Sequence, residues 1–217
     1  MCENDVNRRA ALLQIIGGAL VLGGTAHAEE TLRRTPMVTL GPFYPLDRER
    51  ETDADMTRLR GHANRAKGEV IEVTGRLLNR RGAPVNRGVV EFWQANAAGR
   101  YAHPSDPNTA AALDTDFQGY ARIVTDQTGQ FRILTVKPGA YPAGRDWSRP
   151  PHLHIDAAGR VDRVSSQMWF PDDPLNGQDR VLADYPAAAH PALMAKKLDA
   201  RADGVARFSW DIVLQTG

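Results

Sequence analysis

Hydrophobic and polar residues alternate with a period of two in short runs along this chain, and turn residues separate the runs. Runs of this kind, rich in β-branched and aromatic residues, occur about seven times from residue 69 onward, and such alternation is typical of half-buried strands. The segment 126–129 carries a Gly and predicts a tight turn between two of them. The predicted strands are 69–78, 88–95, 119–126, 130–136, 152–159, 163–170 and 205–215.

With no long helical period, this pattern predicts an all-β fold, an antiparallel β-sandwich with long functional loops. The one helix that the sequence favours lies near residues 191–202, PALMAKKLDARA. Loops as long as those between the predicted strands are often functional in a compact β domain. These long irregular segments are 29–67, 95–118, 136–151 and 171–190.

The N-terminal segment has the pattern of an export signal. Arg8 and Arg9 precede an apolar run that ends at Ala26-His27-Ala28, a small-x-small cleavage pattern. The run is short for a transmembrane helix, which needs about 20 apolar residues, and the paired arginines favour twin-arginine export. We therefore expect an export signal at 1–28, an irregular arm at 29–68 and the sandwich domain at 69–217. The mature protein would be periplasmic or secreted, with no membrane contact after signal removal.

Composition narrows the function classes. The chain has 217 residues, of which 42% are hydrophobic, enough for one globular domain with a core. Lys and Arg number 27 against 26 Asp and Glu, and the net charge of +1 survives signal removal because the signal carries two charges of each sign. This balance predicts no nucleic-acid partner. Cys2 is the only cysteine and lies in the signal, so the mature protein would have no disulfide.

Two histidines separated by one residue are the first candidate chemistry, in the segment RPPHLHIDAAG. The two prolines disfavour a helix, and in a strand His152 and His154 face the same side. Their Cβ atoms would lie about 6.8 Å apart, close enough to converge on one metal ion. Asp156 shares this face but lies about 13.5 Å from His152 along a regular strand, so further ligands must come from elsewhere.

Several interpretations of this pair stay open on the residues alone. It could be a polar strand face, a zinc site, or a ferrous site of two histidines and one carboxylate. The long loops offer Tyr101, His103 and Tyr141 as partners. The spacing does not choose between Tyr101 and His103.

Six sequence fragments, which include the histidine pair and both tyrosine loops, occur together in one order. In that order they resemble the intradiol ring-cleavage dioxygenases of the protocatechuate 3,4-dioxygenase type. They span most of residues 39–214. Several long motifs in the family's order are far more specific than a single His-x-His pair. The fragments are GPFYP, GRLLNRRGAPVNRGVVEFWQANAAGRYAHPSD, DTDFQGYARIVTDQTGQFRILTVKPGAYP, RPPHLH, SSQMWFPDDPLN and FSWDIVL.

The resemblance implies a mononuclear Fe(3+) ion held by Tyr101, Tyr141, His152 and His154, and it selects Tyr101 over His103. Two phenolates and a hydroxide balance the ferric charge, which argues against a ferrous or zinc site. The resemblance also implies that a catechol and dioxygen are the substrates and a cis,cis-muconate is the product. In this scheme Tyr141 takes a catechol proton as it leaves the metal.

The resemblance also assigns residues around the metal. Arg149 matches an arginine whose fixed charge stabilises negative charge on the ring, and Gln167 matches a pocket glutamine that polarises substrate or oxygen. Trp169 stands where a Tyr is more usual, which leaves the ring substituent of the substrate open. The positions that line the family's pocket correspond to Gly41, Pro42, Trp93 and Trp169.

The resemblance leaves the assembly and one rival class open. Enzymes of this type pair two dissimilar chains, yet this chain carries a whole ligand set, so a homo-oligomer is expected and a partner chain stays an alternative. A non-catalytic β-sandwich binding module, or the partner subunit of such an enzyme, is the rival interpretation. The filled ligand positions argue against it. A zinc hydrolase is a third hypothesis.

Overall fold

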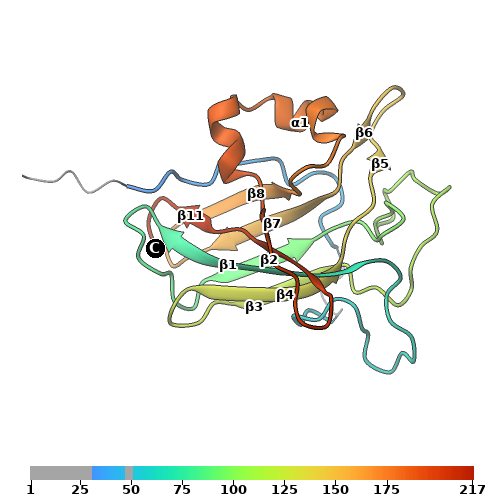
Figure 1. Cartoon of the computed structure of the whole chain (residues 1–217), viewed down its shortest axis with the longest axis horizontal. Coiled ribbons are helices and arrows are strands. Elements are labelled where there is room, and N and C mark those ends of the chain that lie inside the picture. The colour runs from blue at the N-terminus through green and yellow to red at the C-terminus, as the bar shows by residue number, and fades with distance from the viewer. Residues whose placement is uncertain (1–30, 47–50) are drawn as a thin grey trace, which may run out of the picture.

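Two β-sheets packed face to face form the body of the protein (Figure 1). The structure is a computed structural model that describes residues 31–46 and 51–217, so the predicted export signal lies outside the described residues. The predicted all-β sandwich is confirmed. Within the described ranges, no helix has the length and apolar character that a membrane span requires.

The first sheet is built around one long strand, β1 (Val70–Asn79). Strand β4 (Gln130–Val136) pairs with it antiparallel. Strands β10 (Ala206–Ser209) and β11 (Ile212–Leu214) pair with successive parts of β1 in parallel, and β9 (Lys196–Leu198) extends the sheet beyond β10. These two parallel pairings are a departure from the purely antiparallel arrangement that the pattern predicts.

The second sheet is antiparallel throughout and carries the candidate site. Its strand order is β3 (Tyr120–Val124), β2 (Val89–Trp93), β7 (His152–Ala158) and β8 (Arg163–Trp169). The alternation in β7 explains its orientation. Leu153, Ile155 and Ala157 are fully buried in the core between the sheets, so His152, His154 and Asp156 face the other side.

Loops and short helical segments cover this outward face, so that it too is buried. A hairpin of β5 (Tyr141–Pro142) and β6 (Ser148–Arg149) stands at the end of the sheet where β7 begins. The segments η1 (Asn176–Gln178), α1 (Arg180–Ala183) and η2 (Ala187–Ala192) lie over β7 and β8 (Figure 1). The arm before residue 46 runs along β8, where Val38 bonds to the Ser165 carbonyl.

The helix predicted near 191–202 is wrong. The 3-10 turn η2 ends at Ala192, and Lys196–Leu198 form strand β9 instead. Leu198 pairs with Arg207 of β10, and Met194 forms a bridge with Trp169 of β8. These backbone bonds to two neighbouring strands outweigh the helix propensity of the Ala, Lys and Leu residues, which is a weak local preference.

Candidate metal centre

Four nitrogen and oxygen atoms meet above the start of strand β7. The Nε2 atoms of His152 and His154 lie 3.2 Å apart. The hydroxyl of Tyr101 is 3.1 Å from Nε2 of His154, and the hydroxyl of Tyr141 is 3.4 Å from Nε2 of His152. All four side chains are buried. The structure therefore brings together the four predicted ligands, from β7, β5 and the loop after β2.

Backbone register explains how these side chains converge. His154 lies opposite Trp93 of β2 and Gln167 of β8, in one row across the sheet. Tyr141 and Arg149 lie opposite each other in the β5–β6 hairpin. The two prolines after Arg149 lead directly into β7, so the hairpin holds its Tyr and Arg beside the histidines.

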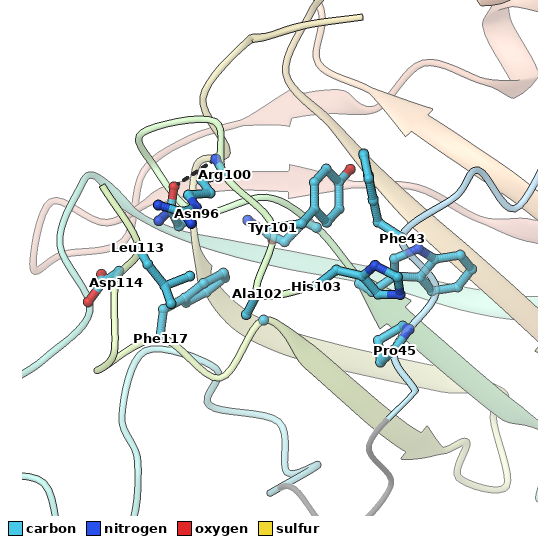
Figure 2. Close-up of a pocket in the computed structure, with 13 residues that line it drawn as sticks. Phe43, Pro45, Asn96, Arg100, Tyr101, Ala102, His103, Leu113, Asp114 and Phe117 are labelled. Atoms are coloured by element: carbon cyan, nitrogen blue, oxygen red, sulfur yellow. Dashed lines mark hydrogen bonds between the residues drawn. The ribbon is translucent and has the colours of Figure 1, made fainter. Parts of the chain in front are cut away.

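Tyr101, and not His103, reaches the histidines. The His103 ring packs at 5.8 Å from the Phe43 ring, and its Nδ1 accepts a hydrogen bond from the Ser105 backbone at 3.1 Å. In Figure 2 the Tyr101 and His103 rings leave the same stretch of backbone in different directions. Of the two residues between which spacing did not choose, Tyr101 thus lies beside the histidines and His103 does not, and the ligand role of Tyr101 stays a prediction.

Hydrogen bonds fix how His152 presents its ring nitrogens. Its Nδ1 is 2.7 Å from the Pro150 carbonyl oxygen, which can only accept, so Nδ1 carries the proton. Its Nε2 then presents a lone pair to Nε2 of His154 and to the Tyr141 hydroxyl. A backbone carbonyl that accepts from the far ring nitrogen is a usual partner of metal-binding histidines. Nδ1 of His154 is buried and has no hydrogen-bond partner among the described residues.

Burial sets the protonation of the four groups in the absence of a cation. Burial, with smaller contributions from Arg149 and His154, lowers the pKa of His152 well below its usual value. Burial and then Arg149 lower the pKa of His154 to about 3. Burial raises the pKa of Tyr141, and it raises the pKa of Tyr101 well above the usual value, with Tyr141 adding to the effect. Two neutral imidazoles and two phenols suit a hard, highly charged cation, since only added positive charge would ionise the phenols.

Aromatic rings back the two histidines. The Trp93 ring stacks on His154 with centroids 5.0 Å apart, and the Trp169 ring lies 6.2 Å from His152. Both indoles are almost fully buried. The structure places Trp93 and Trp169 behind the ligands and not on the wall of the cavity described next, so their contact with a substrate stays a prediction.

A cavity of about 770 Å³ opens beside Tyr141 and Arg149, and Gly41 and Pro42 line it as well. This volume lies in the range of ligand pockets, about 300–1,000 Å³. Gly41 has a φ of +69°, and a Cβ there would be 3.0 Å from Cε1 of His154. Position 41 therefore requires glycine both for its left-handed backbone and for its close approach to His154.

Arg149 is held on several sides. Its Nη2 donates to Oε1 of Gln167 at 2.6 Å, and the Gln167 amide donates to the Thr39 carbonyl at 2.8 Å. Its Nε lies 3.0 Å from a carboxylate oxygen of Asp179. The guanidinium also lies 5.8 Å from the centre of the Trp169 ring. The predicted Arg149 and Gln167 thus form one connected group at the edge of the cavity.

Two aspartates that the sequence reasoning missed support the site. Asp106 accepts a hydrogen bond from the Tyr101 backbone at 2.6 Å and so fixes the loop that carries this ligand. An Asp two residues before Asn108, whose backbone it also binds, is a recognisable Asx-turn signal. Asp179 is fully buried and contacts Arg149, but no local signal in the sequence links the two residues.

The fold and sequence of this chain are similar to those of known dioxygenases. Residues 40–216 match the family model described as dioxygenase. The dioxygenase domain of a carbohydrate-binding fusion protein from Streptomyces sp. SirexAA-E superposes with a TM-score of 0.65 at 23% identity, covering 85% of this chain and 100% of that one. The hydroxyquinol 1,2-dioxygenase of Pseudomonas putida DLL-E4 gives a TM-score of 0.66 at 21% identity, covering 85% of this chain and 67% of that one. Fold and family model together define a dioxygenase on a β-sandwich scaffold.

Curated relatives narrow this class. The protocatechuate 3,4-dioxygenase beta chain of Burkholderia cepacia is 41% identical over 181 residues, covering 80% of this chain and 76% of that one. The alpha chain from the same organism is 28% identical over 194 residues, covering 85% and 94%. The chain belongs to the intradiol ring-cleavage dioxygenase family, as a protocatechuate 3,4-dioxygenase-like member.

Proposed function

We propose that this protein is a ferric intradiol dioxygenase that cleaves the ring of a catechol, protocatechuate-like or otherwise substituted, to a cis,cis-muconate. One observation carries the proposal. Two imidazole nitrogens and two phenol oxygens lie within 3.1–3.4 Å of their neighbours, beside a cavity that Tyr141 and Arg149 line. The family membership supports the same reaction.

The donor set fits Fe(3+), which Tyr101, Tyr141, His152 and His154 would hold. When bound, this ion would supply a Lewis acid that favours the deprotonated catechol. In the overall reaction one catechol and one dioxygen give one cis,cis-muconic acid. Both oxygen atoms stay in the product, so no reductant or organic cofactor is consumed.

The chain's own groups have distinct tasks in this proposal. Tyr141 lines the cavity whereas Tyr101 does not, so Tyr141, which would be a phenolate when the ion is bound, is the group placed to accept a proton from an incoming diol. Arg149 presents a fixed positive charge at the cavity edge, where it stabilises negative charge that develops on the ring. Gln167 holds the guanidinium in place through its Oε1 atom. The loops over the outward face keep water from the buried donors.

The test is a visible absorption spectrum of the purified protein, with iron content, before and after anaerobic addition of catechol or protocatechuate. We expect a tyrosinate-to-iron charge-transfer band that shifts when the diol is added, followed by oxygen uptake when air is admitted. A protein that stays colourless after iron is restored, or that holds zinc, would contradict the proposal. A band without turnover would favour the alternative of a partner subunit.

Assembly and location are part of the same proposal. The two Burkholderia relatives are named as beta and alpha chains, whereas this one chain supplies all four donors, which supports a homo-oligomer that needs no second dissimilar chain. Light scattering and activity of the chain expressed alone test this. Export to the periplasm or outside is supported by the pattern of residues 8–28, and fractionation of cells that express the full chain tests it.

A further inference from the structure

We propose that Asp179 is a positioning residue for Arg149, which it orients and whose charge it compensates at the edge of the cavity. Its effect on turnover rests on the function proposed above. Asp179 lies after β8, in the connection to α1, and touches none of the four metal-site donors. Its contacts with the site therefore run through Arg149 and Trp169, although its charge also acts at a distance on Tyr141.

Contacts to both oxygens hold the Asp179 carboxylate in one orientation. One oxygen lies 3.0 Å from Nε of Arg149 and also accepts the Val181 backbone N–H at 3.1 Å. The other oxygen accepts the indole N–H of Trp169 at 2.6 Å. The Asp179 side chain is fully buried and that of Arg149 is 6% exposed, so both charges are shielded from water.

The bond between the two residues is electrostatic. The Nε atom of Arg149 has no hydrogen-bond partner among the described residues, although the Asp179 oxygen is only 3.0 Å away. The N–H therefore points off the line of contact, and attraction between the charges holds the pair. Such attraction is strong where water is excluded, and an uncharged amide at position 179 would lose it.

Asp179 also decides the charge that the cavity presents. Arg149 is the only charged side chain among the described residues that line the cavity. With Asp179 behind it, the positive charge of the guanidinium is partly compensated, and the cavity wall carries less net charge than an unpaired arginine would give it. Without Asp179 the same wall would present an uncompensated cation, which would attract a diol that bears a carboxylate more than an uncharged diol.

A double-mutant cycle tests this inference. We would measure kcat/KM for Asp179→Asn, Arg149→Ala and the double variant, with catechol and with 3,4-dihydroxybenzoate. Asp179→Asn should lower kcat/KM for catechol about 10-fold in the wild-type background and by less than about 2-fold when Arg149 is already Ala, since residues that act through one another are not additive. The ratio of 3,4-dihydroxybenzoate to catechol turnover should rise in Asp179→Asn alone. Equal losses in both backgrounds, with an unchanged ratio, would overturn the proposal.

Asp156→Asn is the matched control. Asp156 is another buried carboxylate paired with an arginine, Arg163, but it lies outside the cavity. Its substitution should leave the ratio of the two substrates unchanged. Since an amide introduced at position 179 would face an N–H group on either side, Trp169→Phe combined with Asp179→Asn provides a second variant, with Trp169→Phe alone as its reference because Trp169 is itself a predicted pocket residue. The ratio should be higher in the combined variant than in Trp169→Phe alone.

A readout without turnover separates the two proposals. Thermal unfolding of the four proteins in the cycle reports whether Asp179 and Arg149 stabilise the fold as a pair. We expect the sum of the two single-variant losses in melting temperature to exceed the loss in the double variant. Additive losses would overturn the pairing. If the wild type cleaves no catechol, the proposed function fails, and the melting cycle still decides the role of Asp179.

Discussion

The polar side chains at the two ends of the outward face of β7 differ in how completely their atoms are hydrogen-bonded. At its start, the Nε2 atoms of His152 and His154 lie 3.2 Å apart beside two tyrosine hydroxyls, and the buried Nδ1 of His154 has no hydrogen-bond partner among the described residues. Two positions further on, Asp156 is surrounded by donors, with Nε of Arg163 at 2.8 Å and the Ser165 hydroxyl at 3.1 Å. Buried polar groups are ordinarily satisfied, so the unsatisfied end marks the functional site and the satisfied end marks structure.

The largest effect should come from the unsatisfied end. We expect His152→Ala to lower iron content and turnover by about 100-fold or more, because even the loss of a residue that only hydrogen-bonds to a metal ligand costs about 10–100-fold in metal affinity. Metal analysis and oxygen uptake measure this. Asp156→Asn, on the same face of the same strand, should keep its iron. Loss of iron in both variants would mean that iron retention depends on the integrity of strand β7 and not on His152 as a ligand.

Next in size is Arg149→Ala, which should keep the iron and its colour but lose turnover by about 100-fold, the usual cost of one preorganised electrostatic group. The visible spectrum and steady-state kinetics give the two readouts. Arg149→Lys keeps the charge but not the planar fork that contacts Gln167 and Asp179 together, so it should recover little. Full activity of Arg149→Ala would remove the residue from the mechanism.

The sequence predicted the histidine face well because period-two alternation is a local property. Leu153 and Ile155 lie in the core, and that alone turns His152 and His154 outward. The pairing of Arg149 with Asp179 could not be predicted, because it joins a β-hairpin to the start of a distant short helix through the packing of loops, and such tertiary context overrides local signals. The same holds for Lys196–Leu198, where pairing with β10 replaced a predicted helix.

Acid should destabilise the metal-free protein through the two histidines. Burial depresses the pKa of both histidines, that of His154 to about 3, so the unfolded chain binds more protons than the native protein between about pH 6.5 and pH 3. Stability is therefore highest above pH 6.5 and falls as the pH drops through this window. Each histidine contributes a slope of up to about 1.4 kcal/mol per pH unit.

Denaturant unfolding at pH 7, 6 and 5 measures this slope. The double variant His152→Gln and His154→Gln should show a flatter dependence than the wild type over the same range. Iron should instead steepen it, because metal binding keeps the rings neutral and ionises the two phenols, so the native state carries still fewer protons than the unfolded chain. An equal slope in the wild type and in the double variant would show that other groups control acid unfolding.

The smallest effect belongs to the satisfied end. Arg163→Ala should cost about 1–2 kcal/mol of stability, because the buried Asp156 carboxylate loses its ion-pair partner and leaving such a group unpaired is unfavourable. The loss stays modest because the Arg163 side chain is 63% exposed, so water already screens part of the attraction, and the Ser165 hydroxyl remains.

Iron content and kcat/KM of Arg163→Ala should equal those of the wild type within about 2-fold, since distant substitutions are nearly independent. Arg163→Lys should restore part of the stability and again leave turnover unchanged, because it replaces the charge without the two-nitrogen contact. A loss of iron on Arg163→Ala would mean that the two ends of β7 are coupled. The carboxylate end would then hold the strand at the register in which the histidine pair meets the tyrosines.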